Sequence, residues 1–308
     1  MRHAILGAGG VGLALGAALS RGGHDVTLVM RESTRARYSG VVDVRSKLRG
    51  DHRVAVRAVD RLVESPDVLW VTVKAPALDA ALARTDPALL PGAVVPLLNG
   101  LDHPGPLRAR FGPRQIVGAI RIEAERTGPG QVTWNSLFAE VVLAADEGFT
   151  ARPGSPTPDL IAEALADAGI GCATAPDPAG VLWHKLVLLL PLALATTAAD
   201  GPLGIVRRRP ELLALLHDAA REICALAATE DVTVDAPHLL HTLDKLPGRT
   251  DTSLHRDVTA GARPTELAAL TEPVLRRARD RALPLPAIAE LTRRAAEREL
   301  RADTPAPQ

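Results

Sequence analysis

Glycine is concentrated in one short stretch near the start of the chain, GAGGVG at positions 7–12. An apolar segment at 3–6 precedes it, and a segment rich in alanine and leucine at 13–20 follows it. This is the G-x-G-x-x-G spacing between a strand and a helix, in which the first glycine permits a tight turn, the second lets a pyrophosphate approach, and the third lets helix and strand pack closely. A glycine-rich turn without a ligand is the alternative. The surrounding strand, helix and second strand at 25–30 favour a dinucleotide bound at the helix N-terminus. The residues of the expected turn are Gly7, Ala8, Gly9, Gly10, Val11 and Gly12.

Arg31 follows the second expected strand, at the position where an acidic residue would hold the ribose 2′-hydroxyl of NAD. A guanidinium matches a 2′-phosphate in charge and geometry, whereas a carboxylate would repel it. The sequence therefore predicts NADP(H) as the cofactor, with Arg35 as a second cation. The alternative is that Arg31 caps an exposed turn and Glu32 contacts the ribose.

Near-continuous apolar runs, separated by helical stretches such as 77–83, predict a parallel sheet that is buried on both faces. In such sheets the ligand lies beyond the carboxyl ends of the strands. Lys74 and Asn99 stand at such ends and are expected to meet the cofactor, although each could be only a turn residue. The further strands are expected at 68–73, 93–98, 116–120, 139–143 and 170–174.

The line APDPAG, at 175–180, has the proline and glycine content of a linker, and strand signals nearly vanish after it. Apolar residues at helical spacing predict helices at 210–228, 265–282 and 287–300. The expected fold is α/β, with an N-terminal Rossmann-type, doubly wound parallel sheet at 1–175 and a C-terminal all-α domain at 176–308.

Lys185 is a lone charge in the apolar stretch VLWHKLVLLLPLALATTAA, at 181–199. A lysine near a helix start can extend its ammonium to water, which is the commoner outcome. Alternatively, desolvation lowers its pKa so that it can give up a proton near neutral pH. His184 is the rival proton donor, but neighbours on a helix point roughly 100° apart, so both cannot face one pocket. His103 and His255 are taken as ordinary polar residues.

Charge and cysteine content exclude several classes of partner. Lys plus Arg equals Asp plus Glu at 36 each, so no bulk positive field attracts nucleic acid or anionic membrane, and a small-molecule substrate is expected. Two cysteines without metal-ligand spacing predict no metal, no disulfide and a reducing cytoplasm.

The apolar run after Lys185, about fourteen residues interrupted by Pro191, is expected to be too short for a membrane span of roughly twenty. The glycines of the first segment argue against a secretory signal.

A series of short motifs runs along the chain in this order: GAGGVG, Arg31, VTVKA, LLNG, ERTGPG, LWHKL and TSLHRDVTAGARPTEL. In these motifs and their order the chain resembles the 2-dehydropantoate 2-reductases, or ketopantoate reductases, over almost its whole length. The resemblance implies an NADP-dependent carbonyl reductase in which Lys185 is the proton donor. It also implies cofactor contacts from Lys74 and Asn99, with Asn99 near the substrate as well. Further roles implied are a backbone contact from Ala124 to the nicotinamide end, a substrate contact from Ser253, and an acid, Glu266, that reaches the cofactor and lies close to the lysine.

The chain departs from the family where the family's asparagines hold the polar groups of the substrate. Those positions are Leu189, Ala193 and Leu203 in an ungapped alignment, and no asparagine follows Asn135. An apolar wall after Lys185 predicts a substrate larger and more apolar than ketopantoate. The alternatives are a reductase of another ketone or an imine in specialised metabolism, and an NADPH-binding protein without turnover. The apolar helices of the second domain also allow a homodimer.

Overall fold

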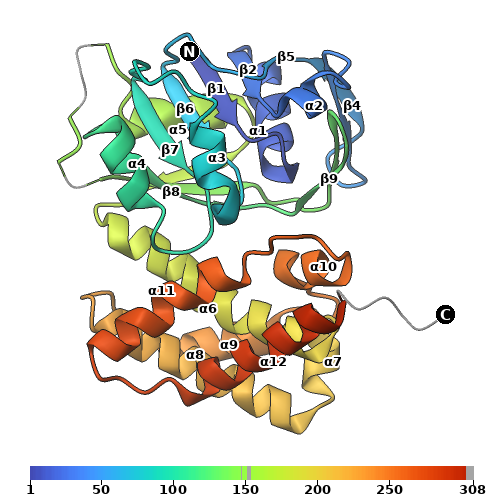
Figure 1. Ribbon diagram of the computed structural model, residues 1–308, viewed down its shortest axis with the longest axis vertical. Coiled ribbons are helices and arrows are strands. Elements are labelled where there is room, and N and C mark those ends of the chain that lie inside the picture. Colours follow the sequence, from blue (N-terminus) through green and yellow to red (C-terminus); the bar gives the residue numbers. More distant parts are fainter. Residues whose placement is uncertain (147, 151–153, 303–308) are drawn as a thin grey trace. The chain divides into compact units, whose positions relative to one another are not determined.

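The computed structural model describes residues 1–146, 148–150 and 154–302 and contains two compact units, Met1–Leu182 and Trp183–Gln308 (Figure 1). The boundary between the units falls inside α6 (Pro178–Ala199). The boundary predicted from the linker, at 175/176, lies just before that helix.

The first unit contains a five-stranded sheet, in the order β5-β2-β1-β6-β7, in which every pair of neighbours is parallel. Because successive side chains of a strand point to opposite faces, Ile5 joins one apolar cluster together with Leu13 of the following helix, while Leu6 joins the other cluster. A parallel sheet covered on both faces confirms the Rossmann-type fold. The strands are β1 (Arg2–Leu6), β2 (Asp25–Val29), β5 (Arg57–Val59), β6 (Val68–Val71) and β7 (Ala93–Pro96). The helices after them are α1 (Gly10–Arg21), α2 (Glu32–Arg35), the short 3₁₀ helix η1 (Ala75–Ala77), α3 (Leu78–Leu82) and α4 (Pro104–Phe111).

The strands after β7 were expected to extend the parallel sheet, and they do not. A single parallel bridge from Val94 to Gln115 links β7 to the start of a three-stranded sheet, β12-β11-β8, in which β11 runs antiparallel to β8. The physical reason is the connection: residues 122–139 form a pair of antiparallel strands and no helix, so they do not supply the helical crossover that usually joins parallel strands. Helix α5 supplies such a crossover, and β12 is parallel to β11. The elements are β8 (Ile116–Arg121), β11 (Glu140–Ala145), α5 (Pro158–Asp167) and β12 (Gly171–Thr174).

A four-stranded sheet, in the order β4-β3-β10-β9, was not predicted from the sequence. The two central strands, β3 and β10, alternate buried and accessible residues, so that Val42, Val44, Val132 and Trp134 join the apolar cluster of α1. This sheet brings the start of β9 next to the glycine turn. Its strands are β3 (Val41–Arg45), β4 (His52–Ala55), β9 (Ala124–Gly128) and β10 (Gln131–Trp134).

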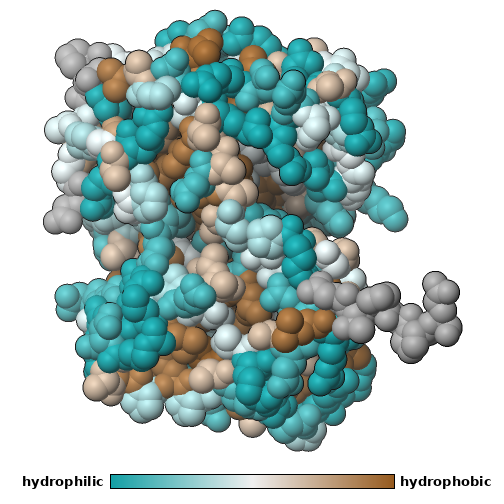
Figure 2. Space-filling model, in the orientation of Figure 1, coloured by the Kyte–Doolittle hydropathy of each residue, from teal (hydrophilic) through white to brown (hydrophobic). Residues whose placement is uncertain are grey.

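The second unit is helical throughout the residues described, which confirms the expected all-α domain. The predicted helix at 210–228 is observed with those bounds, and the other two differ from prediction by a few residues at their ends. Hydrophilic side chains cover much of the face shown in Figure 2, with apolar ones gathered between them. The helices are α7 (Leu203–Arg207), α8 (Pro210–Ala228), α9 (Ala236–Lys245), α10 (Ser253–Thr259), α11 (Leu267–Asp280) and α12 (Pro286–Ala302).

Helix α6 is long and apolar enough to cross a membrane, the one such helix among the residues described. The expectation that this segment is too short was wrong, because the helix continues through Pro191 for 22 residues. Within its most apolar window, 72% of the residues are buried inside the protein. Its apolar character is therefore that of a core helix, packed through Trp183, Leu186, Leu190 and Leu194.

Candidate active site

The glycine turn between β1 and α1 requires its first and last glycines for packing. Gly7 has φ +117°, and a Cβ there would lie 2.6 Å from Cγ1 of Val73. A Cβ on Gly12 would lie 1.9 Å from the carbonyl oxygen of Gly7 and 2.6 Å from Oγ1 of Thr72. These distances are far below van der Waals contact, so any side chain at Gly12 would force helix and strand apart.

The two glycines in the middle of the turn, Gly9 and Gly10, differ in the space around them. A Cβ on Gly10 would lie 2.1 Å from the carbonyl oxygen of Ala124, the first residue of β9. A Cβ on Gly9 would meet no atom within 4 Å. Gly9 is the N-cap of α1, so the open space lies beside the N–H groups that begin the helix. The turn thus has the shape that a pyrophosphate requires, and Ala8 and Val11 are half-buried against the core on its other side.

Thr72, which directly follows β6, contacts this turn and was not predicted from the sequence as a site residue. Its hydroxyl donates a hydrogen bond to the carbonyl oxygen of Gly7, with an oxygen–oxygen distance of 2.7 Å, and ties the end of β6 to the turn. The available signal was its place in VTVKA, directly after the apolar run of the strand and two residues before Lys74.

Arg31, Lys74 and Asn99 occupy the carboxyl edge of the parallel sheet. They follow β2, β6 and β7, and the strand order places β1, with the glycine turn, between β2 and β6. Arg31 and Lys74 are exposed, and Asn99 is half-buried. Arg31 is the N-cap of α2, and the Nε of Arg35 donates to the carbonyl oxygen of Ala58 at 2.7 Å, which fixes its guanidinium beside β5. Cationic side chains therefore lie beyond the two strands, β2 and β6, that flank the glycine turn.

Lys185 lies near the start of α6, between the buried residues Trp183 and Leu186. Its side chain is half-buried, whereas that of His184 is exposed, so the two neighbours differ in environment as the helical geometry requires. Burial lowers the pKa of Lys185 to about 8, and the negative charge of Glu266 acts in the opposite direction. An ammonium with that pKa exchanges its proton readily near neutral pH.

Glu266 is the N-cap of α11 and is 4% exposed. It precedes the helix directly, so the positive end of the helix dipole supports its negative charge. Its electrostatic interaction with Lys185 brings together two residues that are 81 positions apart in the chain. The second unit therefore contains the acid and amine pair that the family resemblance implied.

The positions four and eight residues after Lys185 are apolar and buried to different degrees. Leu189 is half-buried, and Ala193 is 1% exposed. The hydroxyl of Thr197 donates to the carbonyl oxygen of Ala193 at 2.7 Å, so this nearby hydroxyl hydrogen is used within the helix itself. Leu203, the third position, is fully buried.

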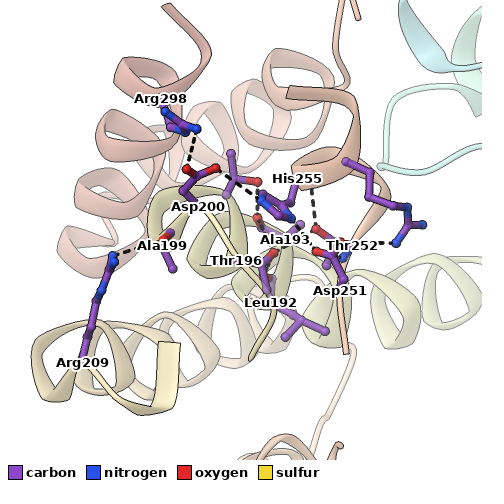
Figure 3. Close-up of polar contacts among 12 residues, drawn as sticks. Leu192, Ala193, Thr196, Ala199, Asp200, Arg209, Asp251, Thr252, His255 and Arg298 are labelled. Carbon is purple, nitrogen blue, oxygen red and sulfur yellow. Dashed lines mark hydrogen bonds and ion pairs between the residues drawn. The ribbon is translucent and has the colours of Figure 1, made fainter. Parts of the chain in front are cut away.

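Ser253 is half-buried and is the first residue of α10. The residue before it, Thr252, is the N-cap, and its Oγ1 lies 2.9 Å from Oγ1 of Thr196 on α6 (Figure 3). The start of α10 is thus anchored to the helix that carries Lys185.

His255 is not the ordinary polar residue that was expected. It is 8% exposed, with Nδ1 at 2.7 Å from Oδ1 of Asp251 and Nε2 at 3.6 Å from Oδ1 of Asp200 (Figure 3). The spacing of four between Asp251 and His255 was visible in the sequence, but the Asp200 partner comes from the end of another helix. The hydrogen bond that His255 donates to Asp251 is the largest cause that raises the pKa of His255 above its usual 6.5.

Comparisons with known proteins show the family of the chain. Residues 3–147 match the family model described as ketopantoate reductase PanE/ApbA, and residues 179–299 match the one described as its C-terminal part. The 2-dehydropantoate 2-reductase of Halobacterium salinarum is 29% identical over 304 residues, which cover 94% of this chain and 96% of the relative.

Two solved structures share the fold over nearly the whole chain. A PanE/ApbA family ketopantoate reductase from Ralstonia eutropha has a TM-score of 0.84 at 25% identity, covering 99% of this chain and 100% of that one. A D-mandelate dehydrogenase, solved with NADH and anilino(oxo)acetate, has a TM-score of 0.85 at 18% identity with the same coverage.

Proposed function

Since the chain belongs to the ketopantoate reductase family and is an oxidoreductase, we propose that it is an NADPH-dependent reductase of a 2-oxo acid or a related ketone, with Lys185 as the proton donor. The observation that carries the proposal is the partly buried ammonium of Lys185, whose pKa is lowered to about 8 beside the carboxylate of Glu266. A bound nicotinamide supplies the hydride. The Lys185 ammonium donates its proton to the carbonyl oxygen as negative charge develops there.

The preference for NADPH over NADH is proposed from Arg31 and Arg35. Arg31 follows the end of β2 by one residue, and Arg35 is held beside β5 by its hydrogen bond to the carbonyl oxygen of Ala58. Two guanidinium groups at this edge would neutralise a 2′-phosphate, which the ribose of NADH lacks. Glu32 is the residue that would contact a ribose hydroxyl if NADH were preferred.

The other site residues take proposed roles from their placement. Lys74 and Asn99 would contact the cofactor at the carboxyl edge of the sheet, and the backbone of Ala124 would do so beside Gly10. Asn99 and Ser253 would hold polar groups of the substrate. Glu266 would keep Lys185 protonated when the pocket is dry, because a nearby negative charge favours the charged form of an amine.

The substrate is proposed to be more apolar than ketopantoate because Leu189 and Ala193 stand where amides would hold its polar groups. An unpaired hydroxyl or carboxylate in a closed site costs about 1 to 3 kcal/mol. This corresponds to a factor of roughly ten to a hundred in kcat/KM for each lost partner. The D-mandelate dehydrogenase of the same fold was solved with anilino(oxo)acetate, a 2-oxo compound with an apolar ring.

The test is NADPH oxidation by the purified protein against a panel of 2-oxo acids, ketones and cyclic imines. The panel includes ketopantoate and the 2-oxo acid that corresponds to mandelate. We expect turnover of a 2-oxo acid with a bulky apolar substituent, and a kcat/KM for ketopantoate at least about tenfold lower. Efficient reduction of ketopantoate would contradict the inferred apolar wall.

A reductase of another ketone or an imine is the second candidate, favoured by the same missing asparagines. A protein that binds NADPH tightly but oxidises it with no member of the panel would contradict both candidates. The lowered pKa of Lys185 favours an enzyme, since a binding protein needs no proton donor.

The chain is further proposed to act in the cytoplasm on a small molecule, and to form a homodimer through the apolar helices of the second unit. Sedimentation velocity tests the dimer directly. A single species near the monomer mass of 32.4 kDa at all concentrations would contradict it.

A further inference from the structure

Helix α6 ends in a conformation that glycine normally adopts, but an aspartate stands there. Asp200 has φ 52°, in the left-handed region, directly after the last residue of α6. Its N–H donates to the carbonyl oxygen of Thr197, and the N–H of Gly201 donates to that of Thr196, which is the Schellman pattern that closes many helices. A residue with a Cβ adopts this region at a cost in free energy, which is smallest for asparagine and aspartate. The contacts of the Asp200 side chain help to offset that cost.

The carboxylate of Asp200 has two cationic partners on different helices (Figure 3). Its Oδ2 lies 2.5 Å from Nη2 of Arg298 on α12. Its Oδ1 lies 3.6 Å from Nε2 of His255 on α10. Asp200 thus connects the end of α6 with α10 and α12.

On its other side His255 is bonded to Asp251, and this bond fixes which nitrogen keeps the proton. The Nδ1 of His255 lies 2.7 Å from Oδ1 of Asp251, which also accepts the N–H of Thr252 at 2.8 Å. A neutral imidazole held in this way keeps its hydrogen on Nδ1 and presents the lone pair of Nε2 to the carboxylate of Asp200. Only the protonated ring can attract both carboxylates.

We propose that His255 is a proton-dependent positioning residue for Ser253: the imidazolium joins Asp251, before α10, to Asp200, after α6, and deprotonation breaks the second link and weakens substrate binding. The inference rests on the proposed role of Ser253 in the substrate site. Ser253 lies between Thr252 and His255 in the first turn of α10, so the orientation of that turn sets the position of its hydroxyl.

The charged groups around His255 come from four parts of the unit. Asp251 precedes α10, and Arg256 of α10 lies 3.7 Å from the second oxygen of Asp251. Asp200 follows α6, and Arg298 comes from α12. Both carboxylates favour the protonated ring and outweigh the opposing effect of burial, so the pKa of His255 is raised above 6.5. The link is therefore complete below this raised pKa and is lost as the pH rises through it.

The kinetic test measures the KM of a 2-oxo acid that the protein reduces, from about pH 6 to about pH 9. It compares the wild type with His255→Gln and Asp200→Asn. In the wild type we expect KM to rise about tenfold on loss of the His255 proton, the value of one charge-assisted contact. The KM of His255→Gln should show no such rise. Asp200→Asn should also lose it, because an amide can donate to the neutral ring. In all three, kcat should keep the inflection due to Lys185.

The exposed His241 of α9 provides the matched control, and His241→Gln should retain the wild-type KM profile. A His255→Gln protein with the wild-type pH dependence of KM would overturn the proposal.

A measurement without substrate separates this inference from the proposed function. Amide hydrogen exchange over 253–256 is measured in the wild type and in His255→Gln at each pH. The protection of the wild type, relative to that of His255→Gln, should fall as the histidine deprotonates. A wild type that reduces no carbonyl but shows this change would refute the proposed function and leave the His255 link standing. Equal relative protection at every pH would overturn the link, whatever the activity.

Discussion

A lysine can protonate a developing alkoxide only while it carries the proton itself. The pKa of Lys185 is about 8, so the ammonium form dominates below that pH and is lost above it. We therefore expect kcat for carbonyl reduction to be level in the acidic range and to fall as the pH rises through about 8. A kcat that rises through this range would assign the proton donor elsewhere.

Removal of the same amine tests its role directly. Lys185→Ala should lower kcat by roughly two to four decades with little change in NADPH affinity, the signature of a lost proton donor. The exposed Lys245 gives the matched control, since Lys245→Ala removes an equal charge from the same unit. Wild-type turnover by Lys185→Ala would reduce Lys185 to a structural residue.

Arg31 is the residue that should decide between the two cofactors. Arg31→Asp reverses the charge beyond β2, where a 2′-phosphate would lie. The ratio of kcat/KM for NADPH to that for NADH should fall by about tenfold or more, since one charge-assisted contact is replaced by repulsion. An unchanged ratio would favour the alternative in which Glu32 contacts the ribose.

In the turn between β1 and α1, Gly12 is required for packing and Gly9 is expected to be required for cofactor binding. Gly12→Ala places a methyl group 1.9 Å from a backbone oxygen, so α1 must shift away from β1. We expect its Tm to fall by about 5 °C or more, measured by circular dichroism.

Gly9→Ala is the matched variant in the same turn. The added methyl group meets no atom of the protein, and the backbone of Gly9 (φ −82°, ψ −168°) is one that alanine adopts. We expect a Tm within about 2 °C of wild type and an NADPH Kd raised about tenfold, because the methyl group occupies the approach of the pyrophosphate. Unchanged NADPH affinity in a folded Gly9→Ala protein would show that the phosphates do not bind at this turn.

At the scale of the whole molecule, the two thiols lie in different units and neither is paired. Cys172 is half-buried in the first unit, and Cys224 is buried in the second. Burial raises the pKa of Cys172 to about 11, so very little reactive thiolate exists at neutral pH. We expect no change in Tm on addition of a reductant and slow labelling by a thiol reagent until the protein unfolds. A Tm lowered by the reductant would reveal a disulfide between molecules.

Features that depend on short spacing along the chain could be predicted from the sequence. The glycine turn, the cation after β2, the lone lysine in an apolar helix and the helix at 210–228 are each set by residues within one or two turns of each other, and periodicity or a motif reveals them. The family resemblance added the pairing of Lys185 with Glu266, which no local pattern contains.

Features that join distant segments could not be predicted, because they exist only in the folded chain. The sheet of β3, β4, β9 and β10 pairs strands from two separate parts of the chain, and its half-polar strands have too weak a pattern to be read alone. The direction of β11 depended on the connection before it. His255 is surrounded by charges from the loop before its helix, the end of α6 and α12, so its environment exists only after these elements pack, because electrostatic interactions act through space and not along the chain.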